Sequence, residues 1–432
     1  MGKILIGKPY KKVCGDKVRL CAELSWDNEN FEFYYEVDNE YEKYLCVERA
    51  TAFILSILEF ALYKGYDIVS ESPVDGDMYF ALNQYGLKIL SDGVAYYNRI
   101  LIKAPVSYEK PESAGAVGTG FSAGVDSFHA VLSHHGNVDA RHNLTHLLIA
   151  NVGAFSYAKT EVTQKLFYKQ VETLTPAANE LGLPLITVNT NSNDLYLKLD
   201  IPIDLMPSIP AGTPPKICGC VYALEKLFSI YYYASGVGLD KFEFHEGDPH
   251  FYLILWLKLF STDSITFYGA GTEVTRMEKI EYIADNEVVQ KYLSLDFGKN
   301  CSHCNKCMRT MAELYSINML DKYSQVLDIN SFIGHRNRSL GKYFAIKGEI
   351  RDGFVQEILR KCKENHIHIG AAVYLYRWLI YTPFYAVKDV LRKNKAIRRL
   401  YYKLNLDIKR NGETAKMWRS SYLPDMKDDS DE

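Results

Sequence analysis

The chain has 432 residues, with 50 lysines and arginines against 53 aspartates and glutamates, so its formal net charge is −3. At roughly 150 residues per domain, this length predicts two or three domains with ample core. The 47% of hydrophobic and 24% of charged residues are ordinary for a globular protein and argue against long disorder. The near-neutral balance excludes a generally basic nucleic-acid coat, although it is compatible with a local basic patch.

The chain shows no targeting or membrane signal. Residues 7–9 (Gly-Lys-Pro) interrupt the apolar start, so we expect no secretory leader. The longest apolar stretch, 371–387, is broken by Arg377 and Pro383 and is shorter than the roughly 20 residues of a membrane span. Nine cysteines without a leader predict reduced thiols with a metal-binding or catalytic role. We therefore expect a cytoplasmic, multidomain enzyme.

Residues 1–110 carry alternating apolar and polar positions. The segments 18–24 and 31–37 predict half-buried strands, and 50–63 predicts a helix. We expect an α+β accessory domain without a chemical motif, followed by a linker over residues 104–120.

Residues 116–312 alternate strand-like and helix-like segments. A short apolar strand is predicted at 147–152, a helix at 159–181 and a second strand at 183–188. This alternation predicts βαβ units and an α/β domain with a doubly wound parallel sheet. Such sheets bind ligands at the carboxyl ends of their strands, so we expect Asn151 and Asn189 near a bound ligand.

The segment Gly118-Thr119-Gly120-Phe121-Ser122-Ala123-Gly124-Val125-Asp126-Ser127 leads small residues directly into a helix. Backbone N–H groups at a helix N-terminus favour a phosphate anion, and the hydroxyls of Ser122 and Ser127 add donors. A P-loop NTPase is disfavoured because the segment lacks the lysine of that motif. The alternative is an ordinary helix entry without a ligand.

Two further segments carry reactive side chains. Cys218-Gly219-Cys220 stands at a loop-to-helix entry that could lower a thiol pKa, but packing of Cys220 in a core helix explains it equally well. His245-Glu246-Gly247-Asp248-Pro249-His250 could supply a general base or Mg²⁺ ligands, the alternative being a solvated loop.

A C-x2-C-x2-C cluster is formed by Cys301, Cys304 and Cys307. Three thiolates at this spacing can turn toward one tetrahedral ion, for which Zn²⁺ is the usual choice. Lys306 and Arg309 would offset the thiolate charge. The candidates for a fourth ligand are His303, Asp296, Cys218 and Cys220. The alternative is three buried free thiols.

The C-terminal residues 313–432 are predicted to be mainly helical. Residues 388–410 contain nine lysines and arginines but only two acidic residues, Asp389 and Asp407. This excess of positive charge could let the segment contact tRNA or another polyanion. A solvated helix with a tyrosine-rich core face is the alternative. The last residues, 427–432, predict a disordered acidic end.

Ser122-Ala123-Gly124-Val125-Asp126-Ser127 resembles the SGGxDS loop of the PP-loop ATP pyrophosphatases, which have the adenine nucleotide α-hydrolase (HUP) fold. Ala123 stands where the first glycine of that motif usually lies. If position 123 requires a positive φ, alanine costs about 1 kcal/mol or more relative to glycine. The resemblance implies that the loop grips the pyrophosphate of ATP and that the enzyme cleaves between the α and β phosphates.

Two other segments resemble these relatives. The cysteine cluster is similar to the zinc knuckle of 7-cyano-7-deazaguanine synthases, which carry a fourth cysteine several residues upstream, whereas residues 292–300 contain none. Residues 269–280 resemble the place where a loop enters a helix with an arginine and a lysine. By that resemblance Arg276 and Lys279 would offset charge on the α-phosphate. An exposed helical pair is the alternative.

The resemblance as a whole implies an ATP-dependent, AMP- and pyrophosphate-forming enzyme that adenylates a carbonyl or carboxylate oxygen for displacement by a nitrogen nucleophile. Mg²⁺-ATP would bind at Ser122, Ala123, Gly124, Val125, Asp126, Ser127 and Asn151, with Asp126, Arg276 and Lys279 assisting catalysis and Zn²⁺ on Cys301, Cys304 and Cys307. The acceptor would be an unidentified carbonyl-bearing small molecule or nucleobase. The alternatives are a sulfur transferase, if Cys218 or Cys220 is reactive, and a non-catalytic nucleotide- or zinc-binding module.

Overall fold

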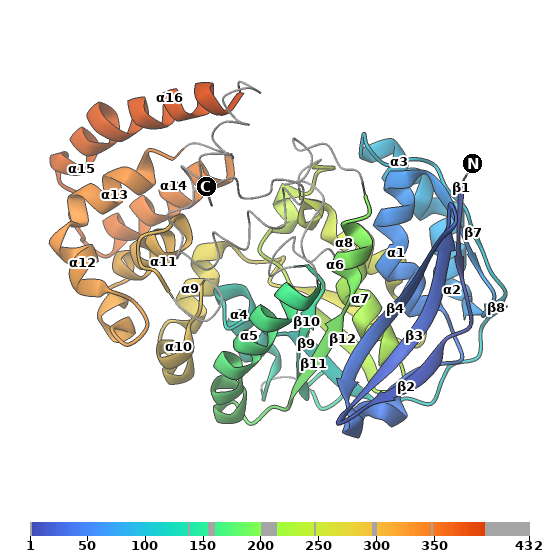
Figure 1. Cartoon of the computed structure of the whole chain (residues 1–432). Helices are drawn as coiled ribbons and strands as arrows, with labels where there is room; N and C mark the ends of the chain where they lie inside the picture. Colours follow the sequence, from blue (N-terminus) through green and yellow to red (C-terminus); the bar gives the residue numbers. More distant parts are fainter. Residues whose placement is uncertain are drawn as a thin grey trace, which may run out of the picture. The chain divides into compact units, whose positions relative to one another are not determined.

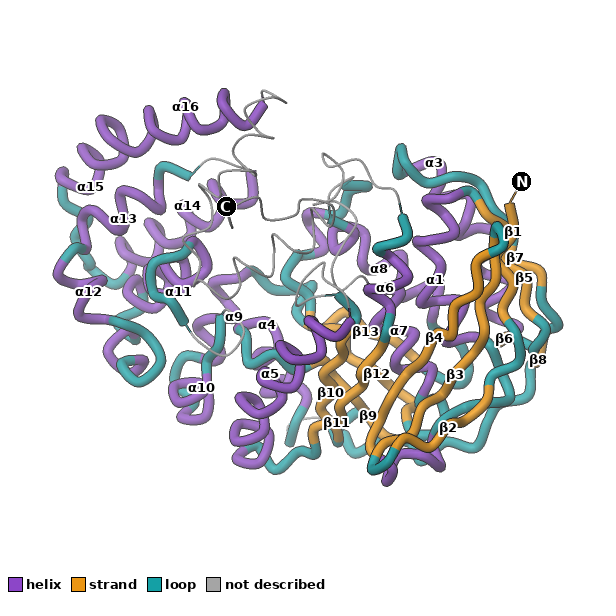
Figure 2. The backbone as a smooth tube through the Cα atoms, in the orientation of Figure 1, coloured by secondary structure: helices purple, strands orange, loops and turns teal. Residues whose placement is uncertain are grey.

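The computed structural model describes residues 2–136, 139–153, 160–199, 214–245, 248–295, 300–346 and 349–393. The protein has an α/β fold with a mostly parallel central sheet and many helices, in a Rossmann-like layout (Figures 1 and 2). Its contacts divide it into two compact units. Within the described residues, unit 1 is drawn from Met1–Phe121 and Ala130–Glu273, and unit 2 from Ser122–His129 and Val274–Arg419. These units do not coincide with the predicted segments 1–110, 116–312 and 313–432.

The strands all belong to unit 1. In chain order they are β1 (Gly2–Ile6), β2 (Tyr10–Cys14), β3 (Lys17–Trp26), β4 (Glu29–Asp38), β5 (Tyr66–Ser70), β6 (Val74–Asp75), β7 (Ile102–Lys103), β8 (Val106–Ser107), β9 (Ala116–Gly120), β10 (His146–Asn151), β11 (Leu185–Thr190), β12 (Phe228–Ala234) and β13 (Thr266–Ala270). Over the described ranges, one sheet holds eleven of them in the order β13-β12-β9-β10-β11-β4-β3-β1-β5-β7, with β2 on β3, and β6 pairs with β8.

The run β13-β12-β9-β10-β11 is parallel throughout. Its apolar side chains are almost all buried, as expected for strands covered on both faces. From β9 the chain first adds β10 and β11 on one side, and later adds β12 and β13 on the other. This reversal makes the carboxyl end of β9 the place where sheets of this kind bind ligands.

The N-terminal strands extend the same sheet. β3 and β4 form a hairpin whose turn residues Asp27 and Asn28 both have positive φ, the conformation that matches the twist of a two-residue hairpin. β4 then pairs antiparallel with β11, placing Glu36 opposite Asn189. The predicted strands at 18–24 and 31–37 are therefore confirmed as strands, and they are continuous with the sheet of the predicted α/β domain.

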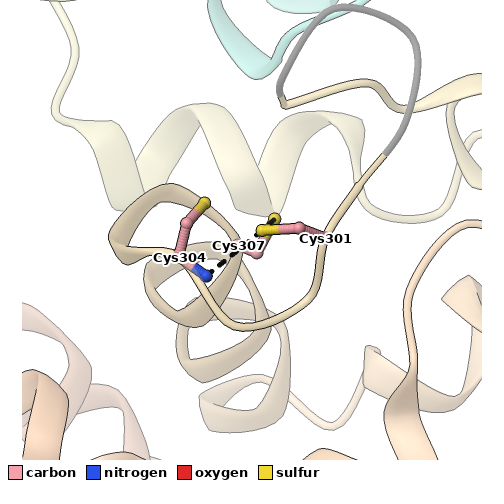
Figure 3. A group of neighbouring side chains, drawn as sticks. All are labelled: Cys301, Cys304 and Cys307. Carbon is pink, nitrogen blue, oxygen red and sulfur yellow. Dashed lines mark hydrogen bonds between the residues drawn. The ribbon is translucent and has the colours of Figure 1, made fainter. Parts of the chain in front are cut away.

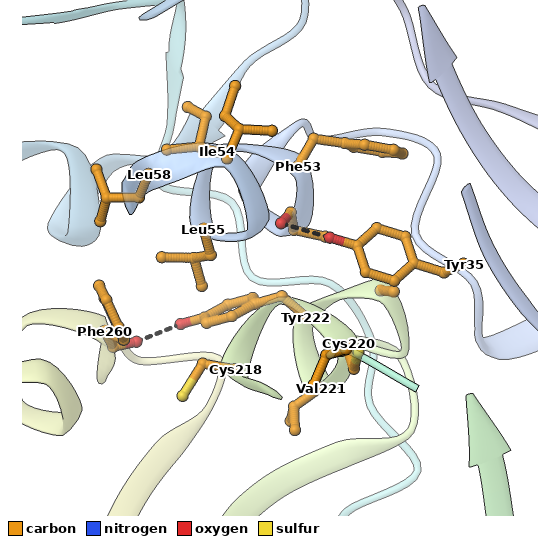
Figure 4. Close-up of a cluster of buried hydrophobic side chains, with 14 of the residues drawn as sticks. Tyr35, Phe53, Ile54, Leu55, Leu58, Cys218, Cys220, Val221, Tyr222 and Phe260 are labelled. Carbon is orange, nitrogen blue, oxygen red and sulfur yellow. Dashed lines mark hydrogen bonds between the residues drawn. The ribbon is translucent and has the colours of Figure 1, made fainter. Parts of the chain in front are cut away.

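Helices α1 (Thr51–Lys64) and α7 (Pro214–Ala223) pack closely inside the core of unit 1 (Figure 4). A Cβ atom at Gly219 would lie 2.5 Å from the Ser56 Oγ and 2.9 Å from the Ala52 carbonyl oxygen, so this approach requires glycine. Tyr35 of β4 donates its hydroxyl hydrogen to the same Ala52 oxygen at 2.7 Å. Residues from the N-terminal strands and from the later part of unit 1 thus share one hydrophobic core.

The other helices of unit 1 are η1 (Asn39–Tyr44), α2 (Gly76–Ala81), η2 (Leu82–Gly86), α3 (Leu87–Gly93), α5 (Thr160–Glu180), α6 (Ser192–Tyr196), η3 (Leu239–Lys241), η4 (Pro249–Tyr252) and α8 (Leu253–Phe260). Helix α4 (Val125–His134) begins in unit 2 and ends in unit 1. Predicted strand 147–152 corresponds to β10, predicted strand 183–188 to β11 and predicted helix 159–181 to α5.

Unit 2 is helical. It contains α9 (Arg276–Ile283), α10 (Glu287–Tyr292), α11 (Asn305–Ser316), η5 (Leu320–Tyr323), α12 (Ile329–Gly334), α13 (Arg336–Phe344), α14 (Glu349–Glu364), α15 (Ala371–Leu375), η6 (Tyr376–Tyr381) and α16 (Thr382–Lys393). Within the described part of the chain, no helix combines the length and the apolarity needed to cross a membrane. The predicted acidic end at 427–432 lies outside the described residues.

Candidate phosphate loop and metal centre

The loop Ser122–Ser127 follows β9 and starts α4. The Ser127 Oγ accepts a hydrogen bond from the Ser122 backbone N–H at 3.3 Å and donates one to the Gly124 carbonyl oxygen at 3.0 Å, which closes the turn. The first N–H groups of α4 have no acceptor within the helix and carry its positive dipole end. Ser122 is exposed and Gly124 and Asp126 are half-exposed, so the turn is open to a ligand.

Ala123 has a φ of 55°, in the left-handed region that glycine usually occupies. Its side chain is buried, and its carbonyl oxygen accepts a hydrogen bond from the Ser294 backbone N–H at 2.8 Å. The position therefore does require a positive φ, and alanine fills it at a cost of about 1 kcal/mol. Alanine thus occupies a backbone conformation that glycine adopts at lower cost.

Arg276 and Lys279 both form ion pairs with Asp126, a residue of this loop. The Arg276 Nη1 lies 3.3 Å from one carboxylate oxygen of Asp126, and the Lys279 Nζ lies 3.1 Å from the other. Both cations are buried, so they are not the exposed helical pair that was the alternative interpretation. The sequence-predicted residues Asp126, Arg276 and Lys279 are thus brought together within unit 2.

Helix α9 positions these two cations. Thr275 caps it through a hydrogen bond from the Glu278 N–H to its Oγ at 3.3 Å, and the Glu278 carboxylate accepts from the Thr275 N–H at 2.6 Å. This reciprocal capping box fixes the first turn of the helix. Arg276 and Lys279, three residues apart, then project from one face.

Helix α11 completes the network. Glu313, which is almost fully buried, lies 3.4 Å from the Arg276 Nε and 3.8 Å from the Arg309 Nε. Thr310 accepts from the Arg276 Nη2 at 3.3 Å. Three cations therefore lie around the carboxylates of Asp126 and Glu313. The sequence did not single out Thr310 or Glu313, because their role depends on which residue α11 packs against.

The charges in this network stabilise one another. Burial opposes ionisation of Asp126, but Arg276 and Lys279 outweigh it and hold the pKa of the carboxyl below its usual value. Burial likewise opposes the charge on Arg276, whereas Glu313 and Asp126 raise its pKa. For Arg309, burial and the nearby Arg276 charge lower the pKa. A polyanion placed here would meet cations that are already oriented.

Asn151 ends β10 in unit 1 and belongs to a buried polar network. Its Nδ2 donates to the Asn189 Oδ1 at 2.9 Å and to the Thr163 Oγ1 at 3.3 Å. Asn189 in turn donates to Glu36 at 3.0 Å. The Asn151 Oδ1 is buried and has no hydrogen-bond partner among the described residues. Asn151 and Asn189 therefore do lie side by side at the strand ends, where they pair with one another.

The three predicted metal ligands cluster at the start of α11 (Figure 3). The sulfur atoms of Cys301, Cys304 and Cys307 all lie within 4.8 Å of one another, and the Cys301 and Cys307 sulfurs are 3.9 Å apart. Hydrogen bonding from Cys307 lowers the pKa of the Cys304 thiol, and the same contact raises that of Cys307. Such a thiolate set could bind a metal ion such as zinc.

No described histidine, cysteine, aspartate or glutamate joins this cluster as a fourth ligand. His303 is exposed and its Nδ1 is hydrogen bonded to the Cys301 carbonyl oxygen. Asp296 lies outside the described residues. Cys218 and Cys220 are packed in the core of unit 1. Three thiolates leave one tetrahedral position for another ligand.

Asn300 anchors the chain that leads into the cysteines. Its Oδ1 accepts from the Leu295 N–H at 2.7 Å, and its Nδ2 donates to the carbonyl oxygens of Leu293 at 2.7 Å and Val326 at 2.9 Å. These bonds bracket Ser294, the residue whose N–H holds the Ala123 carbonyl. The phosphate loop and the cysteine cluster are therefore linked through one short segment, a link that no motif in the sequence revealed.

Cys218 and Cys220 are fully buried on α7 (Figure 4). Burial raises the pKa of both thiols far above the range in which a thiolate forms at neutral pH. The lowered pKa that a helix entry could confer is not observed, and core packing accounts for these two cysteines.

The predicted segment 245–250 orients a histidine. The Asp248 carboxylate lies 2.8 Å from the His250 Nδ1, and the His250 Nε2 lies 3.1 Å from the Tyr233 hydroxyl of β12. Glu246 and Gly247 lie outside the described residues. Two cavities, of about 700 and 390 Å³, lie in unit 1. Gly269, Ala270 and Glu273 of the predicted segment 269–280 line the smaller one, and neither is lined by the loop Ser122–Ser127 or by the three cysteines.

Comparison of the chain with protein-family models, with curated proteins and with solved structures found no significant match. The function is therefore inferred from the residues of the site.

Proposed function

We propose that the chain is an ATP-dependent enzyme of the PP-loop type, with the HUP variant of the Rossmann-like layout, which releases AMP and pyrophosphate. The observation that carries the proposal is the turn Ser122–Ser127, with its left-handed Ala123 and its helix N-terminus, facing the buried pair Arg276 and Lys279 across Asp126. A loop with these donors and cations is suited to a polyphosphate.

The loop amides and the hydroxyl of Ser122 would hold the outer phosphates of ATP. Arg276 and Lys279, held in place by Asp126 and Glu313, would offset charge on the α-phosphate. Asp126 is the half-exposed carboxylate of this group and would hold Mg²⁺, which supplies charge neutralisation to the phosphates when bound. Asn151 belongs to unit 1, and its contact with the nucleotide stays a prediction from the resemblance.

The reaction proposed is adenylation of a carbonyl or carboxylate oxygen. The substrate oxygen attacks the α-phosphorus, the bond to the β-phosphate breaks and pyrophosphate leaves. A nitrogen nucleophile then attacks the activated carbon and AMP departs with the oxygen. The acceptor proposed is a carbonyl-bearing small molecule or nucleobase. Catalysis is mostly positioning and charge stabilisation.

The residues Cys301, Cys304 and Cys307 would hold Zn²⁺ in a structural role, because the bonds of Asn300 join their segment to the phosphate loop. The alternative of sulfur transfer from Cys218 or Cys220 is disfavoured, since both thiols are buried with raised pKa values. Alanine at position 123 was one of the two observations that favoured a non-catalytic module. It carries less weight because Ala123 adopts the positive φ that glycine usually supplies.

The test is to measure Mg²⁺-ATP binding by calorimetry and then to identify the nucleotide product with candidate carbonyl acceptors and ammonia. We expect AMP and pyrophosphate, and we expect Lys279→Met to weaken ATP binding at least tenfold, a change of about 1.4 kcal/mol. Lys322→Met, which removes an exposed lysine of unit 2, is the matched control and should bind as the wild type does. ADP as the product, or no ATP binding, would overturn the proposal.

A further inference from the structure

The outer helices of unit 2 carry an apolar surface. Helices α15, η6 and α16 follow one another without a break, beside α13 (Figure 1). Every exposed position between residues 371 and 387 is apolar or aromatic: Ala371, Tyr374, Leu375, Trp378, Leu379, Ile380, Pro383, Phe384, Ala386 and Val387. We call these ten residues the apolar face. The relative exposure of Trp378 is 60% and that of Leu379 is 72%, so these side chains are fully available to a partner.

The apolar face is the part of α15, η6 and α16 that is not covered when these helices pack on α13. Val373 is completely buried, and Gly341 of α13 makes the closest approach. A Cβ atom at Gly341 would lie 2.8 Å from the Val373 carbonyl oxygen and 2.6 Å from the Tyr376 Cβ. The exposed residues recur at spacings of three and four, which places them along one side of the helical path. A side of this composition is expected to be covered, since monomeric proteins rarely expose a contiguous patch of this kind.

The surroundings of the apolar face are basic. Among the residues of α13, α15, η6 and α16 whose side chains the structure describes, four are basic and none is acidic, in a chain whose net charge is −3: Arg336, Arg338, Lys342 and Arg377. Arg338 donates to the Tyr381 hydroxyl at 3.0 Å, and the Arg377 guanidinium lies 5.3 Å from the centre of the Trp378 ring.

These two properties together identify the partner. A nucleic acid would account for the charge but not for exposed Leu379, Ile380 and Phe384. A protein surface of ordinary composition would account for the apolar side chains but not for the near absence of acidic residues. Tryptophan, leucine and phenylalanine flanked by lysine and arginine are the composition of helices that lie in the headgroup region of an anionic bilayer. We propose that unit 2 docks through the apolar face on an anionic phospholipid surface.

The experiment is sedimentation of the full chain with lipid vesicles. We expect the wild type to bind vesicles of phosphatidylcholine with phosphatidylglycerol at least about tenfold more tightly than phosphatidylcholine alone, with the difference shrinking at high salt. The triple variant Trp378→Ser, Leu379→Ser and Phe384→Ser should lose this binding. The control is the pair Val13→Ser and Tyr108→Ser, which removes equally exposed apolar side chains from unit 1.

Other results would overturn the proposal. Binding that is undiminished in the triple variant would show that the apolar face is not the docking surface. A wild type that binds no vesicles, but forms a dimer that the triple variant does not form, would assign the face to a second copy. Binding of RNA that depends on the three substituted residues, without vesicle binding, would assign it to nucleic acid. Circular dichroism of the variant distinguishes loss of docking from loss of fold.

Discussion

Ala123 shows how alanine can occupy a backbone conformation that usually requires glycine. Its φ of 55° is unfavourable for any side chain with a Cβ, and its burial leaves little room for relaxation. The hydrogen bond from the Ser294 N–H to its carbonyl oxygen holds the strained conformation in place. The methyl group of alanine is tolerated because it is the smallest side chain that can occupy the site.

A larger or β-branched side chain at this position should not be tolerated. We expect Ala123→Val to lower the free energy of unfolding by about 2 kcal/mol or more, because it combines overpacking with a left-handed β-branched residue. Ala123→Gly should leave stability within about 1 kcal/mol of the wild type, since relief of strain and loss of a buried methyl oppose each other. Urea unfolding monitored by circular dichroism measures both.

The control for this series is Ala130→Val, which overpacks a buried position within α4 whose φ is negative. An equal loss of stability at both positions would mean that packing alone explains Ala123→Val. If Ala123→Gly were as destabilising as Ala123→Val, the left-handed conformation would not be the controlling factor.

Asp126 should make stability depend on pH. The carboxyl pKa is held below its unfolded value, near 3.9, by Arg276 and Lys279, so the ionised form stabilises the folded state. This contribution is complete above the unfolded pKa and is lost as the pH falls through the folded pKa. We expect Asp126→Asn to cost about 2 kcal/mol at neutral pH, less than a fully buried pair because Asp126 is partly exposed. The deficit should shrink below about pH 4.

Urea unfolding of wild type and Asp126→Asn across this pH range gives the difference directly. Asp285→Asn is the matched control, because it removes a carboxylate paired with Lys322 at an exposed site of the same unit, where an ion pair contributes little. A deficit for Asp126→Asn that is independent of pH would show that the ionised carboxylate is not what stabilises the network.

At the scale of elements, α11 joins two sites that the sequence presents as separate motifs. Its first turn carries Cys304 and Cys307, and its next turns carry Thr310 and Glu313, which hold Arg276. Upstream of α11, Asn300 bonds to the residues on either side of Ser294, and thereby to the phosphate loop. A metal at the cysteines would therefore stabilise the loop.

Asn300→Ala should weaken both sites together. The change removes three hydrogen bonds, each of which contributes about 1 kcal/mol, and loosens the segment before Cys301. We expect less zinc per chain after dialysis against a chelator, measured by plasma mass spectrometry, and weaker ATP binding in calorimetry. Asn305→Ala, at an exposed position beside Cys304, is the control and should retain both. Loss of zinc with unchanged ATP affinity would contradict the coupling.

The elements themselves were largely predictable, and their contacts were not. Apolar periodicity locates β10, β11 and α5 within a few residues, because burial follows local pattern. The pairing of β4 with β11, and the contact of Glu313 with Arg276, join residues more than thirty positions apart. Nothing local in the sequence specifies them. The loop at 122–127 could be proposed as a phosphate site from the sequence alone because the residues that suggest it are consecutive, and its role stays a prediction.

At the scale of the whole molecule, the continuous sheet joins the N-terminal residues to the later, parallel strands of unit 1. β4 pairs with β11, and α1 packs on α7 across Gly219. The N-terminal 110 residues therefore bury much of their apolar surface against later parts of the chain. An accessory domain that could fold by itself would need to cover this surface on its own.

A fragment of residues 1–110 should consequently fail to fold alone. Without α7, the face of α1 that Gly219 approaches at Ala52 and Ser56 would lose its cover, and without β11 the free edge of β4 would be open to aggregation. Size-exclusion chromatography and near-ultraviolet circular dichroism of the fragment test this expectation. Co-expression of 1–110 with 111–432 is the control, and it should give a soluble complex because the cut lies in an extended connection between β8 and β9. A monomeric fragment with a cooperative unfolding transition would show instead that the N-terminal strands form a domain whose pairing with β11 is dispensable.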